Sequence, residues 1–351
     1  MDAGARAGQL LFAGFEGTRV PRDLADLIAA GRLGGVVLFS RNLEDPGQVR
    51  ALVEELHACA PAGTPLCIGI DQEGGRVQRL RAPWTEWPPM RRVGASGSLE
   101  EVRAVAAGLA RELADLRIDL DFAPVVDVDT RPDNPVIGDR CFSGDPERVG
   151  RLAAAFVESL QAGGVAGCAK HFPGHGDTAE DSHEELPRLD HDLARLRAVE
   201  LPPFRAAIAA GVASVMTAHI LLPALDPLRP ATLSRAAIAL LRGELAYDGL
   251  VFSDDLEMKA VADHFAPREI AQGALEAGVD AFLVCRRAAL RDEVLSALEA
   301  APAPLLREPL RRMRTFKGRW SGGRRARGGG PPYAEHLALA ERLVGAAAEL
   351  A

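Results

Sequence analysis

The chain has 351 residues, 48% of them hydrophobic and 26% charged, which is the composition of an ordinary globular enzyme. The formal net charge of −8 argues against general binding to nucleic acid or to membrane surfaces, and no apolar run is long enough to span a bilayer. The N-terminus has no signal-peptide pattern, and the five cysteines are an odd number without metal-knuckle spacing. We therefore expect reduced thiols, a cytoplasmic location, and no nucleic-acid or membrane partner.

Apolar runs alternate with segments of helical spacing along most of the chain. Runs rich in Val, Ile, Leu or Phe predict strands at residues 10–15, 35–39, 65–70, 118–126, 165–169, 213–217, 249–252 and 279–284. Helical spacing predicts helices at residues 21–30, 46–58, 99–116, 146–162, 192–210, 234–245 and 267–277. This alternation indicates parallel strands joined by right-handed crossovers. Eight strands, several of them apolar throughout, favour a single (β/α)8 TIM barrel of the α/β class, with an open doubly wound sheet as the alternative.

The last part of the chain departs from this alternation. Residues 305–316 and 334–350 have helical periodicity, and we expect both helices to pack on the barrel exterior. The segment 317–332 between them is basic and rich in glycine, which is typical of a mobile, solvated linker. A nucleic-acid contact is the weaker interpretation of this composition in an acidic protein.

Ionisable residues follow five successive predicted strands. They are Asp71, Asp127 and Asp129, Lys170 and His171, His219, and Asp254 and Asp255. Each of them alone is explained equally well as a strand-end cap or a solvated loop residue. Together they point to one face, because the carboxyl ends of barrel strands meet where barrel active sites form.

The segment 168–183 contains three histidines and two aspartates around Pro173 and Gly174. Unpaired charges are costly to bury, so we expect an open loop at the mouth of a cleft. Possible metal ligands in it are His171, His175, Asp177 and His183. The motifs in the rest of the chain favour chemistry that needs no metal and no other cofactor.

Four stretches carry a recognisable pattern in this order: IDQEGGRVQR at 70–79, NPVIGDR at 134–140, KHFPGHGDTAEDSH at 170–183 and SDDLEM at 253–258. They resemble the signature stretches of the bacterial cytoplasmic β-N-acetylhexosaminidases of glycoside hydrolase family 3, the β-N-acetylglucosaminidases of peptidoglycan recycling. The resemblance runs from about residue 8 to residue 284. It implies a catalytic barrel over residues 1–300 and, over residues 301–351, C-terminal helices and a linker that form no separate domain.

The resemblance also implies the catalytic residues. Asp254 matches the nucleophile that forms a covalent glycosyl-enzyme, a role that suits an ionised carboxylate. Asp255 and Glu257 compete for this role, although strand alternation is expected to turn Asp255 to the opposite side. His183 matches an acid/base that replaces the usual second carboxylic acid, and Asp181 matches the partner that orients its ring.

Sugar contacts follow from the same resemblance, because charged groups pair with ring hydroxyls. The matching positions are Asp71, Arg79, Arg140, Lys170 and His171. Arg76, in the same motif, could be a structural ion-pair residue instead of a sugar contact. A structural role is preferred for Asp139. Trp84 and Trp87 could form a sugar-stacking platform or could pack in the core.

The implied function is that of a retaining exo-β-N-acetylglucosaminidase. It would remove non-reducing-end N-acetylglucosamine from anhydro-N-acetylmuramyl muropeptides, a small carbohydrate substrate, as an enzyme that we expect to be monomeric. One alternative is a phosphorylase, in which phosphate intercepts the same glycosyl-enzyme. A metal-dependent hydrolase that uses the His/Asp loop is a further alternative, and a catalytically inactive sugar-binding module is the least favoured.

Overall fold

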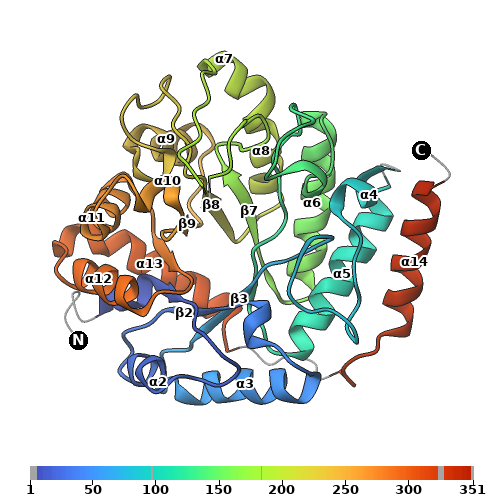
Figure 1. Ribbon diagram of the computed structural model, residues 1–351, viewed down its shortest axis with the longest axis horizontal. Coiled ribbons are helices and arrows are strands. Elements are labelled where there is room, and N and C mark those ends of the chain that lie inside the picture. The colour runs from blue at the N-terminus through green and yellow to red at the C-terminus, as the bar shows by residue number, and fades with distance from the viewer. Residues whose placement is uncertain (1–5, 96–97, 183, 323–327, 349–351) are drawn as a thin grey trace.

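The computed structural model describes residues 6–95, 98–182, 184–322 and 328–348. Eight parallel strands close into a barrel in the order β1-β10-β9-β8-β7-β6-β3-β2 (Figure 1). They are β1 (Leu11–Ala13), β2 (Gly35–Leu38), β3 (Cys67–Ile70), β6 (Leu120–Asp121), β7 (Ala166–Phe172), β8 (Ser214–Thr217), β9 (Leu250–Asp255) and β10 (Ala281–Val284). Each of them overlaps a strand that the apolar runs predict. The closed barrel confirms the expected fold class and excludes the open doubly wound sheet.

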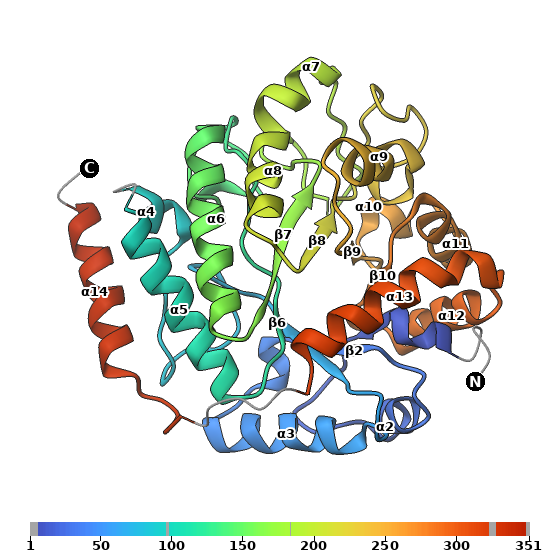
Figure 2. The ribbon, with the colours of Figure 1, turned by 180° about the vertical axis from the view of Figure 1, so that it is seen from behind.

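Helices surround the barrel and pack on its outer face (Figures 1 and 2). The helices that overlap predicted ones are α2 (Arg22–Ala29), α3 (Pro46–Cys59), α5 (Leu99–Asp115), α6 (Pro146–Ala162), α7 (Leu193–Arg195), α8 (Leu201–Ala209), α9 (Arg235–Ala239) and α11 (Pro267–Ala277). A π-helical turn, Leu196–Glu200, joins α7 to α8, and another, Leu240–Glu244, follows α9. The helices α4 (Met90–Ala95), α10 (Lys259–Ala262) and α12 (Ala288–Glu299) are additional to the prediction.

Local sequence explains where two of these helices begin. The side chain of Asp45 accepts hydrogen bonds from the first backbone N–H groups of α3, and Pro46 follows at the first helical position. Asp145 and Pro146 repeat this arrangement at the start of α6. An aspartate cap satisfies amide groups that have no partner inside the helix, and proline has the required φ angle.

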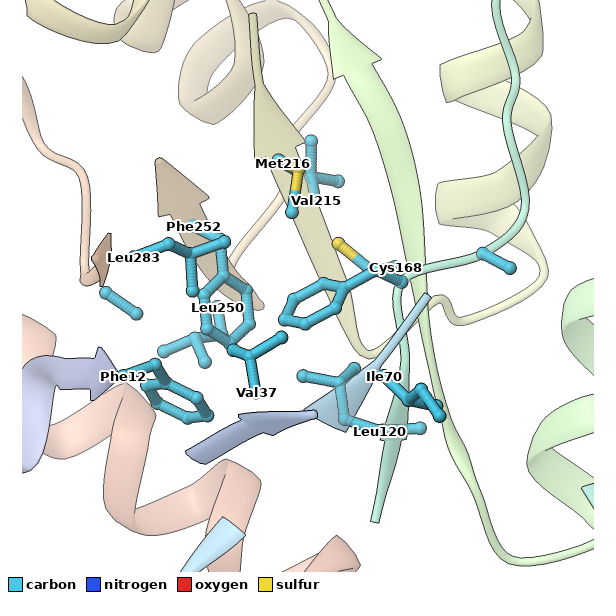
Figure 3. Close-up of a cluster of buried hydrophobic side chains, with 14 of the residues drawn as sticks. Phe12, Val37, Ile70, Leu120, Cys168, Val215, Met216, Leu250, Phe252 and Leu283 are labelled. Carbon is cyan, nitrogen blue, oxygen red and sulfur yellow. The ribbon is translucent and has the colours of Figure 1, made fainter. Parts of the chain in front are cut away.

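The barrel interior is filled by apolar side chains from successive strands (Figure 3). Phe12 of β1 and Phe252 of β9 meet edge to face with ring centroids 5.0 Å apart, and Phe122 packs on Phe252 at 5.5 Å. Such layers of inward-pointing side chains make a barrel a packed core rather than a pore. A ligand can therefore bind only above this core, at an end of the barrel.

The C-terminal helices are α13 (Ala303–Trp320) and α14 (Ala334–Ala348). The α13 helix crosses the amino end of the barrel (Figure 2), where Arg312 forms an ion pair with Asp280, the residue before β10, at 3.2 Å. It extends to Trp320 instead of ending at residue 316, because the side chains of Lys317 and Trp320 are buried. The expected linker is therefore wrong for residues 317–320, and residues 323–327 lie outside the described part of the chain.

The α14 helix packs against α4 and α5 at the edge of the molecule (Figure 1). His336 of α14 lies 5.6 Å from the ring of Trp87, and its Nδ1 is 2.7 Å from the carboxylate of Glu112 in α5. Trp87 and Trp84 are both buried in the main hydrophobic core. These tryptophans are therefore packing residues, and the sugar-stacking interpretation is wrong. None of the helices in the described ranges is at once long and apolar enough to cross a membrane.

Candidate active site

A cavity of about 190 Å³ lies at the carboxyl ends of the barrel strands. Of the residues that the strand-end pattern selects, Asp71, Lys170, His171, Asp254 and Asp255 line it, whereas Asp127, Asp129 and His219 do not. Further lining residues come from the segments that follow β3, β6, β7 and β9. The charged and histidine residues in the lining are Asp71, Glu73, Arg79, Arg140, Lys170, His171, His175, Asp254 and Asp255. All five expected sugar-binding residues and the expected nucleophile therefore face one cavity.

An ion-pair network lines one side of this cavity. The ammonium of Lys170 lies 2.8 Å from Asp71 Oδ1 and 2.6 Å from Glu73 Oε1. Arg140 binds Glu73 with two parallel hydrogen bonds of 2.8 Å. Burial alone would raise the pKa values of both carboxyl groups, but the adjacent cations hold the pKa of Asp71 well below its usual range and that of Glu73 at about 2. Both carboxylates are therefore ionised at neutral pH.

A short hairpin brings Arg79 into the cavity. The antiparallel strands β4 (Gln72–Gly74) and β5 (Val77–Gln78) form it, with Gly74 and Gly75 at φ angles of 94° and 57°. Glycine adopts this region without steric cost, which allows the chain to turn sharply between the two strands. Beyond the hairpin, Arg79 Nη2 lies 3.0 Å from Asp71 Oδ2, and its guanidinium carbon lies 5.3 Å from the centre of the Phe39 ring.

Arg76, within the same hairpin, forms an ion pair with Asp139 at 3.3 Å, and both side chains are about half exposed. Neither residue lines the cavity. The structural interpretation of Arg76 and Asp139 therefore fits their position.

His171 is oriented by a buried carboxylate beneath it. Its Nδ1 lies 2.7 Å from Asp127 Oδ2, and its backbone N–H also points to this carboxylate. His175 donates its backbone N–H to Asp127 Oδ1 at 2.7 Å. Although burial opposes ionisation, the two histidines and these hydrogen bonds lower the pKa of Asp127. The Nε2 atom of His171 is left facing Arg140, 3.4 Å from its Nη2.

The loop after β7 is more buried than the sequence predicts. His175 is almost fully buried, with Thr178 Oγ1 2.7 Å from Nδ1 and Ser182 Oγ 2.9 Å from Nε2. Burial and the neighbouring His171 lower the pKa of His175 to about 4, so the ring is neutral at neutral pH. The expectation of an open loop is wrong here, because hydroxyl groups within the loop satisfy both ring nitrogens.

These contacts also bear on the metal-site alternative. Asp177 accepts a hydrogen bond from Thr130 at 2.9 Å and lies 2.8 Å from His191. Within residues 6–182, 184–322 and 328–348, apart from residues 96–97, no three His, Cys, Asp or Glu side chains are arranged to hold a metal ion. His183 lies outside the described residues. Asp181 is described and is partly buried beside Ser182.

Asp254 and Asp255 end β9 and both line the cavity. Asp254 Oδ1 accepts the backbone N–H of Asp255 at 2.8 Å. Burial raises the pKa of Asp254, but the nearby imidazoles of His171 and His219 outweigh it, and the pKa lies below its ordinary value. Asp254 is therefore a partly buried, ionised carboxylate at the cavity wall.

The expectation that Asp255 faces away is wrong, because the register of β9 against β10 shifts near its end and interrupts the alternation. Asp255 Oδ1 accepts the backbone N–H groups of Glu257 and Cys285. Burial and the charge of Glu257 raise the pKa of Asp255 to about 7. Glu257 itself forms an ion pair with Arg287 at 3.1 Å. Of these three carboxyl groups, Asp254 is the one in the cavity whose pKa favours the ionised form.

Glu73 is a buried site residue that the strand-end pattern does not select, whereas Asp127 is selected by that pattern but not as a partner of His171. Glu73 lies two positions after Asp71, in the same hairpin-forming motif, and Asp127 follows a predicted strand. For each of these two residues, this position in the sequence is the feature that could have identified it as a site residue. Their partners, Arg140 and His171, lie 67 and 44 positions away in the chain, so the pairing itself cannot be read locally.

Known proteins share this sequence and fold. Residues 4–313 match the family described as glycosyl hydrolase family 3 N terminal domain. A β-hexosaminidase of Thiobacillus denitrificans is 43% identical over 296 residues, which is 82% of this chain and 81% of that protein.

Two solved structures are similar as well. A family 3 β-N-acetylglucosaminidase from Paenibacillus sp. superposes with a TM-score of 0.92 at 41% identity, over 98% of this chain and 68% of that chain. NagZ from Neisseria gonorrhoeae, in complex with N-trifluoroacetyl-D-glucosamine, gives a TM-score of 0.83 at 33% identity, over 96% of this chain and 97% of that chain. This chain belongs to glycoside hydrolase family 3 and is a β-hexosaminidase of that family.

Proposed function

We propose that this β-hexosaminidase is a retaining exo-β-N-acetylglucosaminidase that removes the non-reducing terminal N-acetylglucosamine from muropeptides in peptidoglycan recycling. The observation that carries the proposal is the small cavity at the barrel end, with an ionised carboxylate, Asp254, at its wall. Its volume of about 190 Å³ is below the ~300–1,000 Å³ of sites for drug-sized ligands. A cavity of this size suits one terminal sugar ring better than the interior of a long polymer.

Asp254 acts as the nucleophile in this proposal. Its carboxylate attacks the anomeric carbon, the glycosidic bond breaks, and a covalent glycosyl-enzyme forms. His183 gives a proton to the leaving oxygen and later takes one from the attacking water, while Asp181 orients the imidazole. Two successive displacements at the same carbon retain the anomeric configuration. The roles of His183 and Asp181 rest on the sequence resemblance alone.

The remaining charged groups bind the sugar. Asp71 and Arg79 form one pair of hydroxyl-binding groups, and Lys170, Arg140 and His171 form the adjacent group. Their geometry supports this assignment, because all five line the cavity and are held by other buried side chains. Hydroxyl contacts that tighten as the ring distorts would stabilise the oxocarbenium-like transition state.

The bacterial cytoplasm is the proposed location. All five cysteines lie in the described part of the chain and carry free thiols, which supports a reducing compartment. The muropeptide substrate rests on the family resemblance, because peptidoglycan recycling supplies such fragments to the cytoplasm.

Two rate comparisons test the substrate and the reaction type. Turnover of an aryl β-N-acetylglucosaminide should exceed turnover of the matching β-glucoside. An anhydro-muropeptide should release free N-acetylglucosamine at the same initial rate with and without phosphate. A 1-phosphate product would show a phosphorylase instead, and equal turnover of the glucoside would contradict the N-acetylglucosamine specificity.

A leaving-group series tests the proposed acid/base. His183→Ala should lose on the order of 10²–10⁴-fold in rate on a poor leaving group, but should still be glycosylated by an activated aryl glycoside. Deglycosylation then becomes limiting, so a burst of aryl product is expected. Asp181→Ala should show the same pattern less severely. An equal loss on every leaving group without a burst would remove His183 as the proton donor.

A further inference from the structure

Glu73 is a buried carboxylate that lies between two cations of the sugar site. Its side chain is only 2% exposed. Its Oε1 lies 2.6 Å from Lys170 Nζ and 2.8 Å from Arg140 Nη2, and its Oε2 lies 2.8 Å from Arg140 Nε. One carboxylate thus makes three charge-assisted contacts to two residues from different segments, Lys170 of β7 and Arg140 of the segment after β6.

These contacts fix the direction of the donors that remain. The ammonium of Lys170 has three N–H groups, and Asp71 and Glu73 take two of them. The guanidinium of Arg140 has five N–H groups, of which Glu73 accepts two in a fork and the carbonyl of Val136 accepts one, and its Nη2 also lies 3.4 Å from His171 Nε2. A fork of two parallel bonds sets the plane of the guanidinium as well as its position. The remaining donors of both cations therefore have defined orientations.

Glu73 also neutralises a repulsion inside the site. Each cation opposes the charge of the other, and the charge of Arg140 lowers the pKa of Lys170. The carboxylates of Asp71 and Glu73 reverse this effect, so the pKa of Lys170 lies above its ordinary value in spite of burial. Asp71 contacts Lys170 and Arg79, whereas Glu73 contacts both Lys170 and Arg140.

We propose that Glu73 is a positioning residue of the active site, which holds Lys170 and Arg140 side by side so that their free N–H groups meet the hydroxyls of the bound sugar. This inference rests on the proposed function, because it takes Lys170 and Arg140 as sugar-binding residues. Glu73 acts through these two cations and needs no contact of its own with the substrate. Removing it should therefore matter only while the cations are present.

A set of substitutions in the full-length enzyme tests this dependence. Glu73→Gln is made in the wild type, in Lys170→Met, in Arg140→Met and in the variant that carries both cation substitutions. The values of kcat and KM for an aryl β-N-acetylglucosaminide and the Tm are measured for each. Glu112→Gln is the matched control, because Glu112 is equally buried but lies in α5, where it binds His336 at the outer face.

In the wild-type background, Glu73→Gln should lower kcat/KM about 10–100-fold and lower the Tm, whereas Glu112→Gln should change kcat/KM less than about threefold. In the background without both cations, Glu73→Gln should change kcat/KM less than about threefold. It should also raise the Tm there, because a buried carboxylate without cations is less stable than an amide. Should that variant not fold, the effect of Glu73→Gln on kcat/KM should still be at least threefold smaller in each single-cation background than in the wild type.

Two results would overturn the inference, and a third separates it from the proposed function. Equal losses from Glu73→Gln in all backgrounds would mean that Glu73 acts on the substrate or on the fold independently of the cations. A loss of Tm without a change in kcat/KM would mean a purely structural role. Wild-type kinetics of Lys170→Met and Arg140→Met would contradict the proposed sugar site itself, whatever Glu73 does.

Discussion

Two buried lysines at opposite ends of the barrel have opposite environments. Lys170, at the carboxyl end of β7, contacts the carboxylates of Asp71 and Glu73 at 2.8 Å and 2.6 Å. Lys317, in the α13 helix under the amino end, donates to the neutral side chain of Gln9 at 2.7 Å. The paired carboxylates outweigh burial and raise the pKa of Lys170, whereas burial lowers the pKa of Lys317 to about 8.

This difference separates a functional end of the barrel from a structural one. At the carboxyl end, charged groups are buried together and paired, which keeps them charged and oriented for a ligand. At the amino end, the stem of Lys317 fills space between α13 and the barrel floor, and its charge opposes burial. We therefore expect substitutions at the first end to change activity and substitutions at the second to change stability.

The largest difference between the two ends is expected for Asp254. Asp254→Ala should lower kcat/KM by about 10⁴-fold or more, because the other ionised carboxylates described in the cavity lining, Asp71 and Glu73, are held in ion pairs with cations. Lys317→Met is the control at the amino end and should keep kcat/KM within about twofold. Steady-state rates on an aryl β-N-acetylglucosaminide measure both. Substantial residual turnover by purified Asp254→Ala would contradict the assignment of the catalytic function to the carboxyl end of the barrel.

Removing Lys170 is expected to affect both activity and stability. Lys170→Met leaves Asp71 and Glu73 buried without this cation, which should lower the free energy of unfolding by about 3 kcal/mol. The loss of hydroxyl contacts should also lower kcat/KM about 10²-fold. Denaturant unfolding and steady-state kinetics measure the two effects. An unchanged stability would mean that the carboxylates find other partners.

Removing Lys317 is expected to have a smaller effect of the opposite sign. Lys317→Met should raise the free energy of unfolding at pH 7 by about 1–2 kcal/mol. The gain is limited because the oxygen of Gln9 loses its donor. Urea unfolding of the two proteins at pH 7 gives the comparison. Destabilisation by Lys317→Met would show that its contacts outweigh the cost of burying its charge.

The two lysines should also differ in how their contributions to the free energy of unfolding change with pH. The pKa of Lys317 is about 8 in the folded protein against 10.5 for an ordinary lysine, so the folded state releases its proton first as the pH rises. The wild type should therefore gain stability relative to Lys317→Met between about pH 8 and pH 10.5. The raised pKa of Lys170 predicts no such change in the difference between the wild type and Lys170→Met from pH 7 to pH 10. A flat difference for Lys317→Met would contradict the lowered pKa.

The barrel could be predicted from the sequence because several of its strands are apolar throughout and alternate with segments of helical spacing. The hairpin of β4 and β5 could not, because strands of three and two residues carry no periodic signal. The side that Asp255 faces was predicted wrongly for a related reason. Alternation holds only while the strand stays in register, and β9 does not.

The site was predictable as a set of positions and not as a set of contacts. Strand-end spacing selects Asp71, Lys170 and Asp254, because the carboxyl ends of all parallel barrel strands lie on the same face. The bond between Glu73 and Arg140 joins residues 67 positions apart, and the burial of His175 depends on hydroxyl groups that have the same sequence signature as solvated ones. Composition also gave Trp84 and Trp87 two interpretations that only packing could separate.

Covalent trapping tests the central claim most directly, namely that the carboxyl end of the barrel carries the nucleophile. The enzyme is incubated with a 5-fluoro glycoside of N-acetylglucosamine and digested, and the labelled peptide is mapped. We predict one label per chain, on Asp254, and none in Asp254→Ala. A label on Asp255 or Glu257, or no covalent adduct while the fluoro glycoside still inactivates the enzyme, would contradict the account.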